Sequence, residues 1–389
     1  MIEWTDIKLL ESPQNIQGHL SGALGFQFSQ SKALEVASCL KQGRLLFEAA
    51  RQSSLEIKPL QIYYGVQAFA SALVVARTKT SLSAMPRSHG LKDISHPNAK
   101  IEDLKAEILE NGVFQRFNDL LSKHDGFIVD SHRTPVEHSS QSASSTTMKG
   151  LEINLKSVLS RSITCRKVYK TVFNSSAELI PVSPFTDYDD KELIDVRVIC
   201  DENVTNVDDV KALVAGLKSK YKFLAPLWFR RSENIESEKG GTIVEFCNLK
   251  SDKLEEFSDE CLWGDNRDKI YNLPTKQDDN RKGFDKFPIF NDFPPLAGNY
   301  SESWQFYLHP VEQVNFSEFS LKYIGCFMLS IMARYKPNLW MHSISSRVTQ
   351  ERDFDDRCIA LVEMFLEDVL ESYPKLVSKL IRHEVASDT

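Results

Sequence analysis

The sequence predicts an α+β fold in which the N- and C-terminal regions together form a helical bundle and a β-rich mixed region is inserted between them. Apolar residues recur every three or four positions in both terminal regions, as on one face of a helix. Between about residues 165 and 310 this pattern gives way to short β-prone runs broken by turn clusters. A chain of 389 residues, 42% of them hydrophobic, is long and apolar enough for about two or three cores.

Residue composition and hydrophobic periodicity divide the chain into four parts. The first is rich in Gly, Ser and Gln and is expected to be an irregular arm, while the second and fourth carry the helical pattern. The third is interpreted as loops around a small sheet. The parts are the arm, residues 1–30; the first part of the bundle, 31–160; the inserted region, 161–314; and the second part of the bundle, 315–389.

The first part of the bundle is expected to contain two long helices. The first begins after Ser29 or Ser31, both possible caps, and ends near residues 52–54. The second opens with Pro59, where a missing N–H is harmless, and stays almost wholly apolar to about Arg77. Two shorter helices are predicted at 101–110 and 113–121, separated by an Asn-Gly break.

The inserted region is expected to contain four short strands and one helix. The strands are predicted at 168–173, 193–200, 243–246 and 304–308, and the helix at 208–221. Helical pattern then returns at residues 319–334 and 355–373. Pro337 and Pro374 are expected to stop these two helices.

Composition excludes several classes of protein. A formal net charge of −7 disfavours tight non-specific wrapping of nucleic acid, although local basic patches remain compatible with it. The seven Cys form no C-x-x-C pair, so we expect reduced, mostly buried thiols. No Gly-rich nucleotide loop, cofactor or metal site is indicated. The N-terminus lacks a signal pattern and no apolar run reaches membrane length, so a cytoplasmic location without membrane contact is predicted.

Several segments of the two helical regions resemble the YaaC-like bacterial proteins. This resemblance implies an architecture more than an activity, because the family is largely without an assigned reaction. The segments are Gln42 to Ala50, Ile57 to Gly65, Ser88 to Leu91 and Met332 to Trp340.

A more distant likeness concerns mechanism. The Tyr63-Tyr64 helix, followed by a loop with His89-Gly90, is similar to the helical bundles of the HEPN superfamily. That likeness implies a HEPN-like bundle that dimerises, and membership of a group rich in toxins and defence ribonucleases. The superfamily's catalytic signature is an Arg followed four to six residues later by a His. Here only Arg133 and His138 have that spacing, with Pro135 between them forbidding a regular helix.

The candidate catalytic residues are His89, Arg44 and Arg334, with Arg133 and His138 as an alternative pair. His89 lies in a loop closed by a glycine, where a His can reach a backbone carbonyl or a ligand. Arg44 can pair with Glu48 one turn away, and Arg334 can bind the last carbonyls of its helix. Alternatively, both arginines meet His89 as an anion-binding cluster, since guanidinium groups bind phosphate in bidentate geometry.

Candidate substrate-binding residues complete the set. At most one of two adjacent tyrosines on a helix can face the core squarely, so the other must find a hydrogen-bond partner or solvent. Two adjacent arginines beside aromatic residues could contact single-stranded nucleic acid, or could lie at a strand end with extended side chains. These candidates are Tyr63, Tyr64, Arg87, Arg230 and Arg231.

Two functions from different classes therefore stay open. By resemblance, the protein is an RNA- or nucleotide-contacting component of bacterial defence or stress systems, with metal-independent ribonuclease activity as the enzymatic hypothesis. The expected partners are RNA or a nucleotide, a protein encoded in the same defence operon, and a second copy in a homodimer. The alternative is a non-catalytic scaffold that oligomerises through its bundle.

Overall fold

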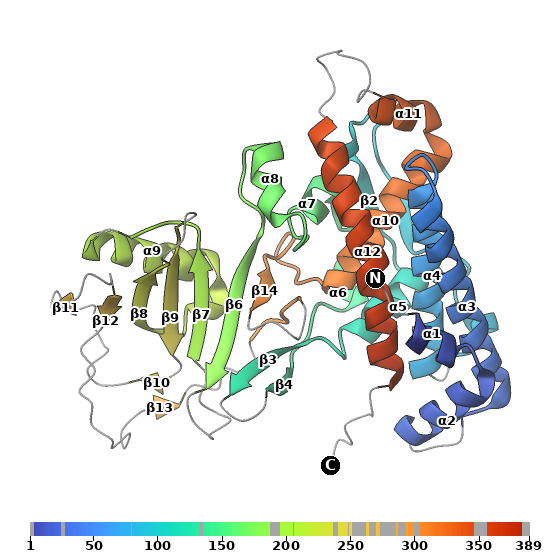
Figure 1. The fold of residues 1–389 in the computed structure, drawn as a ribbon, viewed down its shortest axis with the longest axis horizontal. Coiled ribbons are helices and arrows are strands. Elements are labelled where there is room, and N and C mark those ends of the chain that lie inside the picture. The colour runs from blue at the N-terminus through green and yellow to red at the C-terminus, as the bar shows by residue number, and fades with distance from the viewer. Residues whose placement is uncertain are drawn as a thin grey trace. The chain divides into compact units, whose positions relative to one another are not determined.

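The chain forms two compact units (Figure 1). Unit 1 contains Met1–Ser122, Ala143–Glu178 and Val311–Thr389, and unit 2 contains Lys123–Ser142 and Leu179–Pro310. The computed structural model describes residues 4–24, 28–78, 80–131, 135–186, 195–204, 206–235, 240–247, 249–250, 262–263, 270–272, 285–286, 293–298, 304–345 and 356–382.

The predicted fold class is wrong, because the structure is mixed α/β and unit 1 is not a HEPN-like helical bundle. Unit 1 contains a three-stranded antiparallel sheet in the order β1-β2-β5. Strand β2 lies where a helix was expected at 101–110, and every second side chain of it is buried. Strands of three or four residues are too short to show a periodicity that separates them from helix. The strands are β1 (Leu91–Asp93), β2 (Lys105–Ile108) and β5 (Glu152–Asn154).

The helices of unit 1 surround α4, which is buried along nearly its whole length. α4 is the one helix among the described residues with the length and composition of a membrane span, but 78% of its apolar 18-residue stretch is buried inside the protein. The helices are α1 (Thr5–Leu10), α2 (Pro13–Leu24), α3 (Gln30–Gln52), α4 (Lys58–Arg77), η1 (Leu82–Ala84), η2 (Ile101–Asp103), α5 (Val113–Leu121), α6 (Ser145–Met148), α7 (Leu155–Leu159), α8 (Arg166–Phe173), α10 (Glu318–Tyr335), α11 (Pro337–Ser345) and α12 (Asp356–Arg382).

Glycines let α3 and α4 approach closely. A Cβ at Gly43 would lie 2.7 Å from the Phe69 ring, and one at Gly65 would meet the Phe47 ring. The two rings pack edge to face with centroids 5.1 Å apart. Of the two possible caps, Ser29 is the one that caps α3, because its hydroxyl accepts a hydrogen bond from the Lys32 backbone N–H at 3.3 Å.

Three further predictions in unit 1 are wrong because tertiary packing outweighs local sequence preference. The expected arm forms α1 and α2, which bury Leu10 and Leu20 completely. The expected strand at 168–173 is α8, whose buried residues Tyr169 and Val172 are three apart, as on a helix face. Finally, α12 continues through Pro374 to Arg382.

Unit 2 is a mixed sheet in which most neighbouring strands are antiparallel and β3 pairs with β6 in parallel. The strand order is β11-β12-β8-β9-β7-β6-β3-β4, with β14 also paired with β6. The elements are β3 (Gly126–Ser131), β4 (Val136–Ser139), β6 (Leu179–Thr186), β7 (Asp195–Cys200), α9 (Val207–Lys220), η3 (Lys222–Leu224), β8 (Trp228–Asn234), β9 (Thr242–Cys247), β10 (Leu249–Lys250), β11 (Leu262–Trp263), β12 (Ile270–Asn272), β13 (Asp285–Lys286) and β14 (Gln305–Leu308).

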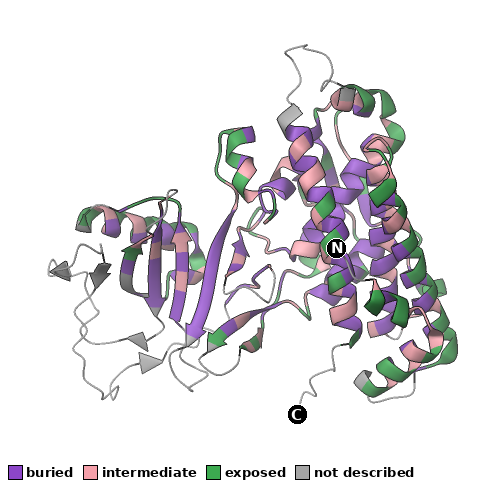
Figure 2. Cartoon of the chain, viewed as in Figure 1, coloured by how far each residue is buried: buried purple, intermediate pink, exposed green. Residues whose placement is uncertain are grey.

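One face of this sheet carries the core of unit 2, and α9 packs on it. Val196 and Val198 of β7 and Val244 of β9 belong to one buried cluster with Val210 and Val214 of α9. Buried residues accordingly gather along β6, β7 and β9 in Figure 2. Because successive side chains of a strand point to opposite faces, the residues between these valines lie on the other face.

Candidate functional site

The loop that carries His89 is held by backbone contacts with the start of α5. The carbonyls of Ser88 and His89 accept hydrogen bonds from the first two N–H groups of that helix, at 3.0 Å from Val113 and 3.1 Å from Phe114. Those N–H groups have no partner within a helix, so the loop satisfies them. Gly90 has φ +83°, in the region that favours glycine. The Asn-Gly break found in the sequence thus positions His89.

The His89 side chain lies half-buried beside α4 and α10. Its Nδ1 is 3.2 Å from Nε2 of Gln67, and its ring lies against Tyr63, with centroids 5.6 Å apart. Burial and then the positive charge of Arg334 lower the pKa of His89 from its ordinary value of 6.5. The imidazole is therefore neutral at neutral pH. With the Gln67 amide nitrogen as donor, Nδ1 accepts and the ring proton lies on Nε2.

Arg334 and Tyr64 form the exposed side of the same cluster. Arg334 Nη1 donates a hydrogen bond to Tyr64 Oη at 2.7 Å, and the guanidinium lies over the Tyr335 ring, 4.7 Å from its centroid. The side chain of Arg334 is exposed, so its remaining N–H groups can reach a ligand from solvent. We call Gln67, His89, Tyr64 and Arg334 the His89 cluster.

Tyr63 supports the cluster from the core. It is only 3% exposed and packs against Phe327 and Tyr323 at centroid distances of 5.8 and 5.9 Å. Burial and then the neighbouring Tyr323 raise its pKa, so the phenol stays neutral. The structure thus separates the tyrosine pair as expected, with Tyr63 in the core and Tyr64 hydrogen-bonded at the surface.

The His89 cluster has the donors that an anion needs. A neutral imidazole with its proton on Nε2 is a hydrogen-bond donor, and an exposed guanidinium adds a full positive charge. If the Gln67 amide is reversed, its oxygen accepts from Nδ1–H and Nε2 becomes a free base. The orientation of the Gln67 amide therefore decides whether Nε2 of His89 donates a hydrogen bond to an anion or accepts a proton.

Arg44 is not part of the His89 cluster. On α3 it forms an ion pair with Glu11 and donates to Glu48 Oε2 at 2.7 Å, and it is only 9% exposed. The hydrogen bond with Glu11 raises the pKa of Arg44 despite its burial. Two carboxylates neutralise the guanidinium, so we assign Arg44 a structural role in joining α1 to α3.

The remaining candidates lie elsewhere. Arg87 is exposed two residues before His89. His138 belongs to β4 of unit 2, where its ring stacks on Phe127 with centroids 5.3 Å apart. Arg133 lies outside the described residues, and Arg230 and Arg231 belong to β8 with side chains that are not described.

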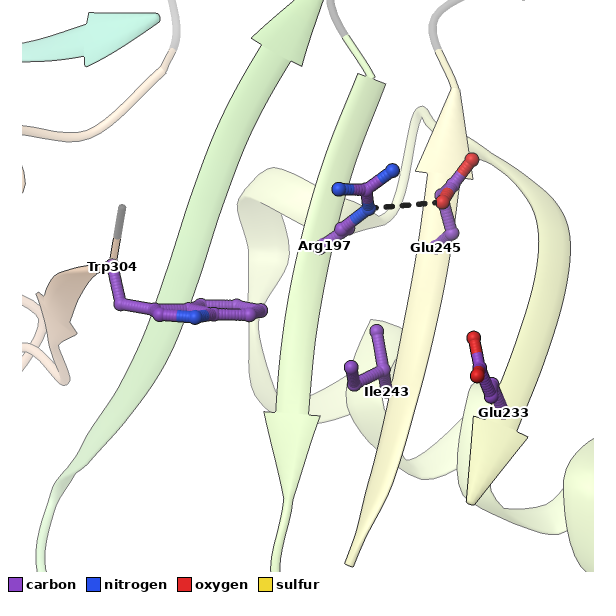
Figure 3. A pocket seen from close by; sticks show the side chains of 5 residues that line it. All are labelled: Arg197, Glu233, Ile243, Glu245 and Trp304. Carbon is purple, nitrogen blue, oxygen red and sulfur yellow. Dashed lines mark hydrogen bonds and ion pairs between the residues drawn. The ribbon is translucent and has the colours of Figure 1, made fainter. Parts of the chain in front are cut away.

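Sequence reasoning missed two groups of polar residues. Gln67 lies four residues after Tyr63 on a largely apolar helix, so its spacing could have placed it on the same face. A pocket in unit 2 is lined by Arg197, Glu233, Ile243, Glu245 and Trp304 (Figure 3). The sequence feature that could have revealed this pocket is an ionisable residue between two apolar residues of a strand, as in Val196-Arg197-Val198.

Comparison with known proteins identifies a family. A family model described as YaaC-like Protein matches residues 10–381, which confirms the resemblance read from the sequence. The suggested likeness to HEPN proteins is not confirmed. No curated protein and no solved structure matches the chain.

Proposed function

The chain belongs to the YaaC-like family, and from that premise we propose that it contacts RNA or a nucleotide through phosphate groups bound at the His89 cluster. The observation that carries this proposal is the pairing of a neutral, half-buried His89 with the exposed guanidinium of Arg334. A phosphate placed between them receives one neutral and one charge-assisted hydrogen bond. Tyr64 orients Arg334 for this contact through the 2.7 Å hydrogen bond.

The charge of the chain is compatible with a local contact of this kind. A net charge of −7 opposes extended binding along a nucleic-acid backbone, which needs many cationic contacts. A few phosphate contacts near Arg334 and Arg87 do not need a basic surface. The ligand supported best is therefore a nucleotide or a short single-stranded segment of RNA.

Replacing Arg334 with Gln is expected to weaken binding of a short single-stranded RNA by about tenfold or more, since a charge-assisted hydrogen bond contributes about 1.5–3 kcal/mol. His89→Gln is expected to weaken it less, because the lost donor is neutral. Fluorescence anisotropy of a labelled oligonucleotide measures both effects. Arg51→Gln, which removes an exposed Arg at the end of α3, is the matched control and should leave affinity unchanged. Equal affinity in all four proteins would contradict the proposal.

The enzymatic form of the proposal concerns the same cluster. With Nε2 free, His89 would accept the proton of a ribose 2′-hydroxyl while Arg334 stabilises the charge that develops on the phosphate. Incubating the four proteins with RNA, with and without divalent metal, tests this step. Cleavage without metal that leaves 2′,3′-cyclic phosphates and disappears in His89→Gln is the expected result for a ribonuclease. If the protein binds RNA without cleaving it in this way, its function is RNA binding and not ribonuclease activity.

A scaffold function is the second candidate, and the surface of α3 favours it. Leu34 and Leu45 are 57% and 49% exposed, and a hollow of about 450 Å³ beside Leu45 is also lined by Lys41 and Leu46. Exposed leucines on one helix suit a contact with a second copy of the chain. A scaffold of this kind would bind no RNA in any of the four proteins.

The proposed setting of either function is the bacterial cytoplasm, in a stress or defence system. The burial of α4, the one described helix with the composition of a membrane span, favours a protein that does not cross a membrane. In this setting we also propose that the protein contacts a partner encoded in the same defence operon and forms a homodimer.

A further inference from the structure

The pocket in unit 2 combines features that point to a ligand. It is a hollow of about 220 Å³ on the face of the sheet opposite α9, and Figure 3 shows Arg197, Glu245, Ile243 and Glu233 spread across three neighbouring strands. The indole of Trp304 lies at the end of this row that is nearer to Arg197 and farther from Glu233. We call this hollow the Trp304 pocket.

The strand registers explain why these side chains share one face. Arg197 of β7 is paired with Glu245 of β9, and Glu233 of β8 is paired with Ile243 of β9. Arg197 lies between two valines of the core cluster, and Glu245 lies between Val244 and Phe246 of the same cluster. By the alternation of strands, the ionisable residues therefore face away from the core and into the pocket.

Arg197 is held in the pocket through its Nε atom, and its terminal N–H groups remain as hydrogen-bond donors. Its Nε donates to Glu245 Oε2 at 3.1 Å, and its guanidinium lies over the Phe185 ring, 3.8 Å from the centroid. Glu245 is only 2% exposed, so the pair is shielded from solvent on the carboxylate side. The terminal N–H groups of Arg197 form no hydrogen bond with the part of the chain that the structure describes.

Glu233 supplies the complementary acceptor. Its carboxylate is exposed and forms no ion pair or hydrogen bond with the described residues. Arg197 and Glu233 belong to strands on either side of β9, which lie about 9–10 Å apart across the sheet. The two residues are also offset by two positions along β9, since Arg197 is paired with Glu245 and Glu233 with Ile243. Ile243 provides an apolar floor between them. The pocket thus presents donors and an aromatic ring at one side and an acceptor at the other.

The charges of the described lining residues disfavour several ligand classes. A simple anion would meet Arg197 but would be repelled by Glu233 and Glu245. A simple cation would meet Glu233 but leave the free donors of Arg197 without an acceptor. A free amino acid with an uncharged side chain carries its two charged groups on one carbon, too close together to reach both sides of β9. A flat, neutral molecule with acceptors at one edge and donors at another satisfies every group.

We propose that the Trp304 pocket binds a guanine-type base. Guanine has acceptors at O6 and N7, which arginine side chains recognise, and donors at N1 and N2, which a carboxylate can accept. Its ring stacks on Trp304. A hollow of about 220 Å³ is smaller than the roughly 300–1,000 Å³ of typical ligand clefts, so it takes the base and leaves the sugar outside. Adenine fits less well, because its N6 is a donor where guanine has the acceptor O6.

Calorimetric titration of the full chain with guanosine and with adenosine tests this inference. The expected result is guanosine binding that is at least about tenfold tighter than adenosine binding, because the wrong base leaves polar groups of the pocket unpaired. Glu233→Gln and Trp304→Leu are each expected to weaken guanosine binding by about tenfold or more. The matched control is Glu202→Gln, which changes an exposed Glu of unit 2 outside the pocket.

The remaining arms identify the source of the base and separate this inference from the proposed function. A single-stranded RNA with guanine, compared with one without it, shows whether the base is bound within a strand or as a free nucleoside. Guanosine carries no phosphate, so Arg334→Gln should bind it as well as the wild type does. Equal affinity for guanosine and adenosine would overturn the assignment, as would binding that survives both pocket substitutions. Absence of guanine-dependent binding to either probe would also overturn it.

Discussion

Replacing Lys322 with Met is expected to lower the free energy of unfolding by about 3–5 kcal/mol, because the substitution leaves two carboxylates whose side chains are only 13% exposed without their counter-charge. Lys322 lies on α10 and is 2% exposed. Its Nζ is 2.5 Å from Glu318 Oε1, 3.0 Å from Asp368 Oδ2 and 3.0 Å from Ser372 Oγ. Burial works to lower the pKa of Lys322, but the two carboxylates outweigh it and raise the pKa, so the amine stays charged.

Equilibrium unfolding in urea measures this effect. The control is Lys58→Met, since Lys58 Nζ is 3.0 Å from Glu367 Oε1 in a pair whose carboxylate side chain is 51% exposed. An exposed pair contributes about 0–1 kcal/mol, so the control should stay close to the wild type. Equal stability losses in the two variants would show that burial does not distinguish the two ion pairs.

Replacing Gly112 with Ala is the second large effect expected. A Cβ at Gly112 would meet the backbone N and Cα of Gly90 and would lie 2.8 Å from the His89 carbonyl carbon. Backbone atoms cannot rotate away as a side chain can, so the loop that carries His89 must shift. Overpacking of this kind costs about 1–3 kcal/mol. We also expect a displaced His89 imidazole and weaker RNA binding.

Urea unfolding and the NMR signal of the His89 ring report the two consequences together. Gly18→Ala is the matched control, because nothing lies within 4 Å of a Cβ at this position in α2. Ala in a helix interior is about 0.5–1 kcal/mol more favourable than Gly, so this variant should be slightly more stable. An unshifted His89 signal in Gly112→Ala would mean that the contact does not position the loop.

The long helices could be predicted from sequence because their patterns run over many turns. α3, α4, α9 and α10 lie where periodicity and capping residues placed them. The shorter elements α5, β7, β9 and β14 also lie close to their predicted positions, but other short elements could not be predicted in this way. β1, β2 and β5 span three or four residues each, and α8 is rich in residues that favour strands. Their conformation depends on contacts with residues far away in the sequence.

The candidate site was partly accessible for the same reason. His89 could be found because a glycine follows it in a loop, and Arg334 because it ends an apolar helix. Their proximity could not be derived, since residues 89 and 334 belong to segments that only the fold brings together. The role of Arg44 could not be derived either, because its ion-pair partner Glu11 lies in a segment that was expected to be irregular.

The measurement that tests phosphate contact at the His89 cluster most directly is the pKa of His89, followed by NMR with and without saturating single-stranded RNA. In the free protein this pKa is lowered by burial and by Arg334. A phosphate bound between the two side chains stabilises the imidazolium and offsets the charge of Arg334, so the pKa of His89 is predicted to rise on binding. A pKa that stays the same while RNA binds would place the contact elsewhere and contradict the account.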